Sequence, residues 1–316
     1  MRMQMTIGVA SAPVSWGIME SVPFPREYPY SRVLDEIAKA GYAGTELGPY
    51  GFLPTDPAAL CNELEQRKLT LCSAFVAIPL ADKAAIGPGL EHVERTAKLL
   101  SEMDCQLLIL SDEITAERCA VAGRCSGTQQ YSYGQEEWQM AKEAICEVLH
   151  LCARLGLKVA FHHHVATHVE TPEEIDHLLS LFSPEELGLC LDTGHCVYGG
   201  GDPEAVLQRH IGRLRCLHFK DIDGVRLEEV RRQQIDFYGA VRGGVFAPLG
   251  RGVVDFSRLL NLVREHRFEG WVVAEQDVLA GGSKSVITNG EFTDSGGRST
   301  TGGWFRPAES SDRRAV

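Results

Sequence analysis

Three consecutive histidines end a short apolar segment within the stretch from Lys158 to Thr171, KVAFHHHVATHVET. In a β-strand, successive side chains point to opposite faces, so His162 and His164 share one face and His163 takes the other. Imidazoles bind metals and transfer protons near neutral pH. One face of this strand end is therefore a candidate metal or proton-transfer surface, although a solvated loop would also explain this segment taken alone.

Other apolar segments of the chain end in the same kind of side chain. A carboxylate at such a position is often only a helix cap, and a single histidine is often a hydrogen-bonded core residue. Imidazoles and carboxylates that recur at the ends of several strands instead indicate one shared site. The further residues of this kind are Glu46 in GTELGP, Asp192 and His195 in CLDTGH, His218 and Lys220 in HFKD, and Glu275 in AEQD.

Segments with strand character alternate with segments of helical period along most of the chain. Such alternation predicts parallel βαβ units, and eight units at this length favour a closed (β/α)8 TIM barrel. An open Rossmann-type sheet is the alternative, and the absence of a GxGxxG motif after the first strand weakens it. The predicted strands are Thr6–Ala10, Ala43–Leu47, Thr70–Val76, Gln106–Ser111, Leu157–His162, Leu187–Asp192, Leu214–Phe219 and Trp271–Glu275.

Helices are predicted between these strands, and several begin with a capping residue followed by proline. Asp56, Thr171 and Asp202 are such caps, and Glu174 completes a capping box with Thr171. The predicted helices are Ser31–Ala40, Pro57–Lys68, Leu90–Glu102, Gln135–Leu155, Pro172–Leu181, Pro203–Gln208 and Phe256–His266.

Two regions depart from this alternation. Residues 221–252 are charged and rich in arginine and glycine, which indicates a long βα loop over the active face. After Ala280 the chain is polar and rich in glycine, so we expect disorder for most of it. The predicted organisation is therefore a catalytic barrel over residues 1–280, with an atypical or missing eighth helix, and a disordered tail over residues 281–316.

The composition is that of a soluble globular protein, with 44% hydrophobic and 23% charged residues and a net charge of −12. The acidic surface argues against nucleic acid or an anionic membrane as the main partner. The sequence lacks a signal peptide and a membrane-spanning apolar run, so we expect a cytoplasmic protein. The ten cysteines form no CxxC pair and are interpreted as reduced, mostly buried residues. A small polyol or sugar is the expected partner, and self-association is possible.

Active sites of (β/α)8 barrels lie at the carboxyl ends of the strands, where the side chains above would meet. His162, Asp192, His218 and Glu275 form a mixed nitrogen and oxygen set that suits Mn²⁺, Co²⁺, Zn²⁺ or Fe²⁺. A carboxylate beside a metal-bound carbonyl, such as Glu46, could remove a proton from the adjacent carbon.

Lys220 shares a strand face with His218, so its ammonium group could stabilise the oxygen anion that proton removal creates. His195 lies on the turn that leaves the strand ending at Asp192, where it could contact a substrate hydroxyl or act as the base in place of Glu46.

The ordered series SAPVSWG, GTELGP, FHHHVATHVET, CLDTGH, HFKD, PLGRGVVDF and WVVAEQD resembles the xylose-isomerase-like sugar isomerase/epimerase superfamily, most closely its inosose dehydratase group. The resemblance spans roughly Ile7 to Asp277. It implies a (β/α)8 barrel with one divalent cation, bound by Asp192, His218 and Glu275. Mn²⁺ and Co²⁺ are the metals that we expect first. It also directs attention to Trp16, His164 and Arg251 as substrate-binding residues.

The sequence differs from the epimerases of this superfamily at the metal ligand on the fifth strand. That ligand is glutamate in those enzymes, and the matching residue here is His162. His164 and Glu170 are alternative ligands at this point. The hypothesis we favour is a metal-dependent lyase that dehydrates a cyclic keto-polyol such as inosose. The main alternative is a metal-dependent ketose isomerase or 3-epimerase that acts through the same enolate. A metal-dependent endonuclease and a non-catalytic binding module are more distant alternatives.

Overall fold

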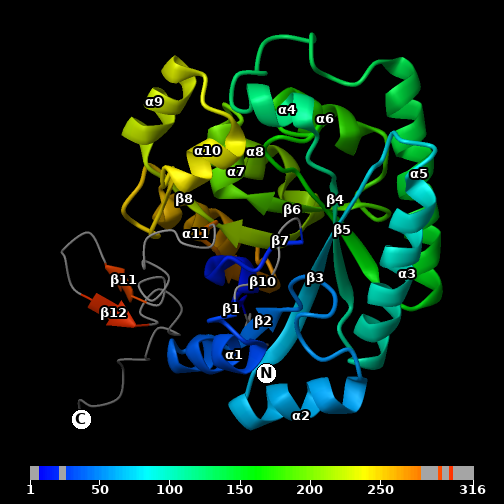
Figure 1. The fold of residues 1–316 in the computed structure, drawn as a ribbon, viewed down its shortest axis with the longest axis vertical. Helices are drawn as coiled ribbons and strands as arrows, with labels where there is room; N and C mark the ends of the chain where they lie inside the picture. The colour runs from blue at the N-terminus through cyan, green and yellow to red at the C-terminus, as the bar shows by residue number, and fades with distance from the viewer. Residues whose placement is uncertain (1–6, 21–25, 279–290, 294–298, 302–316) are drawn as a thin grey trace, which may run out of the picture.

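Eight parallel strands close into a barrel in the order β1-β10-β7-β6-β5-β4-β3-β2 (Figure 1). The computed structural model describes residues 7–20, 26–278, 291–293 and 299–301. The predicted (β/α)8 fold is confirmed, and the open-sheet alternative is wrong. The barrel strands are β1 (Ile7–Ser11), β2 (Gly44–Glu46), β3 (Thr70–Ile78), β4 (Leu107–Asp112), β5 (Lys158–His162), β6 (Gly188–Asp192), β7 (Leu214–Phe219) and β10 (Gly270–Ala274).

The inside of the barrel explains why polar residues gather at one of its ends. A layer of small and thiol side chains fills the interior, among them Ala160, Cys190 and Cys216. Each of these three residues lies two positions before a polar one, namely His162, Asp192 or His218. Because side chains alternate along a strand, the polar residues form the next interior layer, at the carboxyl end.

Helices surround the barrel (Figure 1), and apolar residues of strands and helices form the main hydrophobic cluster between them. The predicted caps are present, since the side chains of Asp56, Thr171 and Asp202 each accept a backbone hydrogen bond. Thr171 and Glu174 form the predicted capping box. The helices that follow the barrel strands are α1 (Tyr30–Lys39), α2 (Pro57–Arg67), α3 (Ile86–Glu102), α5 (Gln135–Arg154), α6 (Pro172–Ser180), α8 (Pro203–His210) and α11 (Phe256–Glu265).

Short helical turns occupy several βα loops at the carboxyl end of the barrel. They are η1 (Pro13–Trp16), α4 (Ala116–Val121) and α7 (Thr193–Tyr198), and a further turn, η2 (Ile211–Arg213), precedes β7. Within the described part of the chain, no helix is both long and apolar enough to cross a membrane. All ten cysteines are free thiols, as predicted.

The segment predicted as a long loop over the active face has regular structure of its own. It contains β8 (Asp221–Ile222), α9 (Gly224–Gln233), α10 (Phe237–Arg242) and β9 (Phe246–Ala247), with β8 and β9 paired antiparallel. Phe237 and Phe246 anchor it in a second hydrophobic cluster with Tyr198 of α7. The insertion therefore covers the carboxyl end of the barrel as an ordered subdomain, where the sequence analysis expected only a loop.

Most of the predicted disordered tail lies outside the described residues. Within it, β11 (Glu291–Thr293) and β12 (Ser299–Thr301) form an antiparallel pair. Residues 275–278, which follow β10, are not helical, and residues 279–290 lie outside the described part of the chain. The domain boundary at residue 280 therefore stays a prediction.

Candidate active site at the carboxyl ends of the strands

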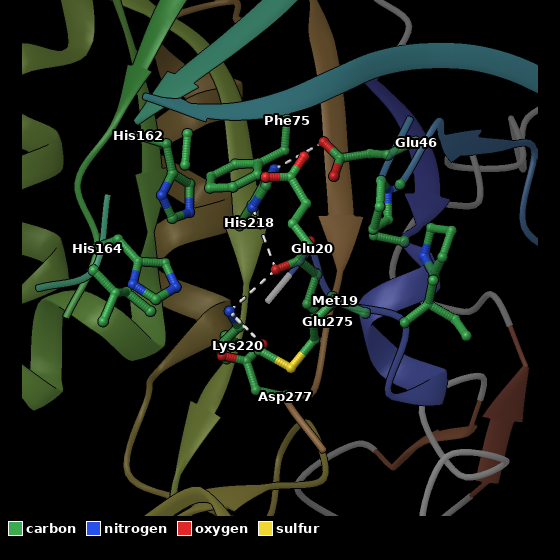
Figure 2. Close-up of a pocket in the computed structure, with 18 of the residues that line it drawn as sticks. Met19, Glu20, Glu46, Phe75, His162, His164, His218, Lys220, Glu275 and Asp277 are labelled. Atoms are coloured by element: carbon green, nitrogen blue, oxygen red, sulfur yellow. Dashed lines mark hydrogen bonds and ion pairs between the residues drawn. The ribbon is translucent and has the colours of Figure 1, made fainter. Parts of the chain in front are cut away.

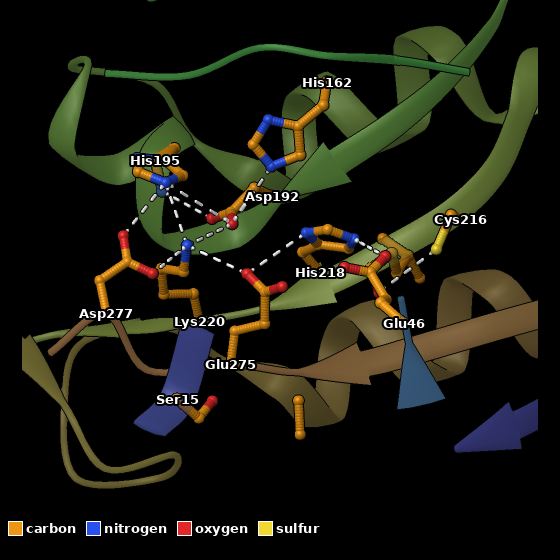
Figure 3. A network of polar contacts seen from close by, with 12 residues as sticks. Ser15, Glu46, His162, Asp192, His195, Cys216, His218, Lys220, Glu275 and Asp277 are labelled. Carbon is orange, nitrogen blue, oxygen red and sulfur yellow. Dashed lines mark hydrogen bonds and ion pairs between the residues drawn. The ribbon is translucent and has the colours of Figure 1, made fainter. Parts of the chain in front are cut away.

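Four consecutive barrel strands bring the predicted metal-ligating residues together (Figure 3). His162 of β5 has its Nε2 atom 3.6 Å from Oδ2 of Asp192 at the end of β6. His218 of β7 has its Nδ1 atom 3.3 Å from Oε2 of Glu275, which follows β10. The His162 and His218 rings lie 4.9 Å apart. All four residues are at most 4% exposed, so the set is withdrawn from bulk water.

Asp192 has two roles that its sequence position left as alternatives. Its Oδ1 atom accepts a hydrogen bond from the His195 backbone N–H at 2.8 Å and caps the first turn of α7. Its Oδ2 atom lies 3.0 Å from Nζ of Lys220. One carboxylate thus ends the strand, begins the helix and presents its second oxygen to the site.

Lys220 lies at the centre of the polar cluster. Its Nζ atom is 3.0 Å from Asp192, 3.1 Å from Glu275 and 2.8 Å from Asp277. Nε2 of His195 is a fourth neighbour at 3.0 Å. Burial disfavours the charged amine, but the three carboxylates outweigh it and raise the Lys220 pKa well above its usual value. Lys220 is therefore a permanent cation in this site.

Glu46 closes the site from the opposite side of the barrel. Its Oε1 atom accepts a hydrogen bond from Ser73 Oγ at 2.8 Å and lies 3.1 Å from Nε2 of His218. His218 therefore lies between two carboxylates, Glu46 at one ring nitrogen and Glu275 at the other. Burial alone would raise the pKa of Glu275, but His218 and Lys220 lower it to about 2.

A cavity of about 380 Å³ opens in front of these residues (Figure 2). One part of its wall is polar and contains the predicted ligands His162, His218 and Glu275. The remaining wall mixes polar and apolar side chains, as the walls of small-molecule sites do. Further polar residues of the wall are Glu20, Glu46, Asp112, Glu113, His164, Lys220 and Asp277, and its apolar residues include Val14, Ile18, Met19, Phe75, Ile114 and Tyr238.

The two histidines predicted to contact substrate occupy different positions. His164 lines the cavity, in line with the shared face that alternation predicts for His162 and His164. His195 is fully buried behind it, with the two rings 3.8 Å apart. Its Nε2 atom lies between Lys220 and Asp277 Oδ2, the latter at 3.5 Å. Burial, together with His164, lowers the pKa of His195 well below the usual value, so His195 supports Lys220 as a neutral ring.

Trp16 and Arg251 are not brought into the cavity. The Trp16 indole N–H donates to Glu36 on α1 at 2.6 Å, and the ring packs in the main hydrophobic cluster. Arg251 is exposed on the loop after β9.

Glu170, the alternative ligand, also faces elsewhere. Its two oxygens accept hydrogen bonds from the backbone N–H groups of Gly123 and Ala166. Its carboxylate is therefore used to fix two loops.

Several residues that line the cavity had no role predicted from the sequence. Asp277 could have been predicted, because it follows Glu275 by two positions and so shares its face. Asp112 carried the same signal as Asp192, a carboxylate at a strand end. Asp112 Oδ2 accepts from the Tyr133 hydroxyl at 2.9 Å, and no local pattern in the sequence indicates that contact. Glu20, in the loop after β1, also had no recognisable signal.

The side chains of the cluster fit a divalent cation. Nitrogen and oxygen atoms of His162, Asp192 and His218 lie within 4.8 Å of one another, and so do those of Glu46, His218 and Glu275. Within the described part of the chain, the buried Nδ1 atom of His162 has no hydrogen-bond partner.

Charge points to the same conclusion. Four buried carboxylates, Glu46, Asp192, Glu275 and Asp277, share two basic side chains. Lys220 contacts three of them, and His218 contacts Glu46 and Glu275. Burial disfavours the charged His218 ring, but Cys190, Glu275 and Glu46 raise its pKa well above the usual value. Burial raises the Asp277 pKa to about 6 although Lys220 lowers it, which still leaves this carboxyl largely ionised at neutral pH. A divalent cation would offset the negative charge that Lys220 and His218 leave uncompensated.

Comparison with known proteins places the chain in a family. The model of the xylose isomerase-like TIM barrel matches residues 34–285. The chain belongs to this family. Among curated proteins, the chain is 32% identical over 280 residues to inosose dehydratase of Geobacillus kaustophilus (strain HTA426), with 85% of this chain and 87% of the relative covered. It is 31% identical over 270 residues to inosose dehydratase of Clostridium beijerinckii (strain ATCC 51743 / NCIMB 8052), with 84% and 88% covered.

Among solved structures, the chain is similar to the IOLI protein with a binding zinc atom. The TM-score is 0.65, the sequence identity is 14%, and the match covers 90% of this chain and 95% of that one. At this identity the likeness supports the fold alone.

Proposed function

We propose that this chain catalyses the divalent-metal-dependent dehydration of a cyclic keto-polyol of the inosose type. The proposal rests mainly on one observation, the buried cluster in which carboxylates outnumber cations beside a cavity sized for one small ring. The similarity of about 30% to proteins named inosose dehydratase over most of the chain supports a sugar-modifying enzyme and directs the choice of substrate.

His162, Asp192, His218 and Glu275 are the residues that we expect to hold the metal. When bound, a divalent cation would act as a Lewis acid on the substrate ketone and so make the neighbouring C–H bond more acidic. His162 stands where the epimerases keep a glutamate. A neutral imidazole there leaves one proton-accepting carboxylate fewer in the site, which favours a reaction other than the two-base epimerisation.

Glu46 is the base in this proposal, and His195 is not. Glu46 lines the cavity, whereas His195 lies behind His164 and its Nε2 atom contacts Nζ of Lys220. The Ser73 hydrogen bond holds one Glu46 oxygen in place, so the carboxylate is oriented toward the cavity. The carboxylate takes one proton from the carbon next to the ketone, and the electron pair of the C–H bond leaves negative charge on the ketone oxygen. The Lys220 ammonium group, fixed by three carboxylates, stabilises that charge electrostatically.

Proton NMR of inosose in D₂O, with the protein and Mn²⁺ and with a chelated control, tests this proposal. We expect the carbinol signals to give way to those of a dehydrated diketone only in the sample with metal. Deuterium incorporation without loss of water would replace the dehydratase by an isomerase or 3-epimerase. An unchanged spectrum in both samples would contradict the proposed substrate.

A further inference from the structure

Glu20 is a carboxyl group at the mouth of the cavity that the proposed mechanism does not yet use. It belongs to the loop that follows β1 and η1, away from the four strands that carry the predicted metal ligands. Figure 2 shows its side chain among those that line the cavity, together with Glu46, His218 and Glu275. We propose that Glu20 is the acid that protonates the departing hydroxyl group, a role that rests on the proposed dehydration.

The reaction requires such a group, and the others in the cavity are committed elsewhere. Lys220 contacts three carboxylates, two of which are expected metal ligands. Asp277 is paired with Lys220 at 2.8 Å. Asp112 accepts hydrogen bonds at both oxygens, from Leu80 N–H and from Tyr133. Glu46 is needed as the base. Glu20 and Glu113 are then the cavity carboxyls that accept no hydrogen bond in the described part of the chain, and the ion contact of Glu20 with His92 is long, at 3.8 Å.

The surroundings of Glu20 favour its protonated form. Its side chain is only 30% exposed. Burial, together with the like charge of Glu113 on the loop after β4, raises the Glu20 pKa to about 7, although Arg95 of α3 acts in the opposite direction. His92 of α3 has its Nε2 atom 3.8 Å from Glu20 Oε1, and burial and Arg95 lower the His92 pKa. The carboxyl can therefore hold a proton near neutral pH and release it, as a general acid must.

Glu113 is a less suitable acid than Glu20. It also lines the cavity, and burial and its neighbour Asp112 raise its pKa. Its negative charge adds to the effect of burial in raising the Glu20 pKa. We therefore assign Glu113 a tuning role and Glu20 the transfer of the proton.

The step balances with these two carboxyl groups. Glu46 takes the proton from the carbon next to the ketone, and the electron pair of that C–H bond enters the conjugated system. The bond from the neighbouring carbon to its hydroxyl oxygen then breaks, and the oxygen leaves with the Glu20 proton as water. The product carries a carbon–carbon double bond next to the ketone. Because the carbon that lost its proton carries a hydroxyl in an inosose, this product is an enol, and it tautomerises to the diketone. Glu46 ends protonated and Glu20 ionised, and exchange with solvent restores both.

The variant Glu20→Gln keeps the shape of the side chain and removes the proton. With inosose and Mn²⁺ in D₂O, we expect dehydration to fall by about 10²- to 10⁴-fold, the usual contribution of one general acid. We expect exchange of the proton next to the ketone to continue at close to the wild-type rate, because Glu46 is untouched. A purely structural role for Glu20 would slow both processes together.

The matched variant Glu113→Gln tests the same role through pH. Because Glu20 must be protonated to act, wild-type kcat/KM should fall as pH rises through about 7. Removal of the Glu113 charge lowers the Glu20 pKa, so in Glu113→Gln the decrease in kcat/KM should begin at lower pH. The residual activity of Glu20→Gln should not decrease over this pH range.

Two outcomes would overturn the assignment in different ways. If the wild-type protein exchanges the proton without losing water, the dehydration is wrong and the role of Glu20 with it. If the wild-type protein dehydrates inosose and Glu20→Gln does so at the same rate, the dehydration stands and Glu20 is not its acid.

Discussion

Two buried charge clusters lie in the βα loops of this barrel, and they are built differently. Arg118 of α4 pairs with Glu174 of α6 through two hydrogen bonds of 2.8 and 2.9 Å, and its other carboxylate neighbour, Glu170, lies 3.7 Å away. Each carboxylate oxygen of Glu170 and Glu174 accepts at least one hydrogen bond. In the candidate active-site cluster, by contrast, four carboxylates share Lys220 and His218, and the buried Nδ1 atom of His162 has no hydrogen-bond partner within the described residues.

We expect this difference to separate a structural ion cluster from a functional one. Hydrogen bonds that satisfy a buried ion pair hold two loops in a single geometry, and loss of one partner leaves an uncompensated charge. An excess of like charge costs stability in the free protein and becomes favourable when a cation arrives. The Arg118 cluster should therefore control folding, and the Lys220 cluster should control metal binding and activity.

The largest expected effect is on activity, from Asp192→Asn. The asparagine side chain can still cap α7, because its oxygen accepts the His195 N–H as aspartate does. The negative charge is lost, so we expect a large fall in kcat/KM for dehydration. Changes to residues that only support a metal's ligands reduce activity by about 10- to 100-fold, and the loss of a ligand should exceed this. Steady-state kinetics at saturating Mn²⁺ measures this fall. Activity within threefold of wild type would remove Asp192 from the ligand set.

Arg118→Ala should instead reduce stability. It leaves two buried carboxylates without their cation, and we expect a loss of about 3–5 kcal/mol in the free energy of unfolding, measured in urea. Arg258→Ala is the matched control, because the Arg258 side chain is 66% exposed in its ion pair with Glu204 and should contribute at most about 1 kcal/mol. Equal effects of the two changes would contradict the structural role of the buried cluster.

Glu46→Gln sharpens the contrast by separating activity from stability. Loss of the base should reduce turnover by about 10²- to 10⁴-fold. The change removes one of the excess negative charges, glutamine still accepts the Ser73 hydrogen bond, and Glu275 stays beside His218. The free energy of unfolding without metal should therefore stay close to that of the wild type, because the lost contact of Glu46 with His218 offsets part of the gain. Urea unfolding with a chelator present tests this. A loss of stability as large as that of Arg118→Ala would show that the two clusters do not differ in this way.

The smallest effect should come from Trp16→Phe. Phenylalanine keeps most of the packing but loses the hydrogen bond to Glu36, which is worth about 0.5–1.5 kcal/mol. KM should not change, because the ring packs against the core. A tenfold rise in KM would restore the substrate contact that the sequence analysis expected of Trp16.

Strand periodicity explains how much of the fold and of the candidate site could be predicted from the sequence. The alternation of side chains depends only on neighbouring residues, so the eight strands and the shared face of His162 and His164 were predictable. Polar residues at the ends of consecutive parallel strands must meet, which is why Asp192 and His218 could be grouped in advance. The position of His195 depends on how α7 packs, and no spacing in the sequence encodes that.

The insertion between β7 and α11 shows another structure that the sequence pattern could not predict. Its charged and glycine-rich composition resembles that of a loop, yet Phe237 and Phe246 fix it against Tyr198. These contacts join residues far apart in the chain, as does the hydrogen bond of Trp16 with Glu36. Such pairings follow from tertiary structure and leave no periodic signal.

The central claim is that the overcharged cluster around Lys220 binds a divalent cation. The most direct measurement is a Mn²⁺ titration of the metal-free protein, followed by electron paramagnetic resonance of the free ion, for wild type and Asp192→Asn. The account predicts one saturable site per chain in the wild type and its loss in the variant. It also predicts stabilisation of the wild type alone, by about 2.7 kcal/mol at a Mn²⁺ concentration 100 times Kd. Saturable binding that is equal in both proteins, or absent from both, would contradict it.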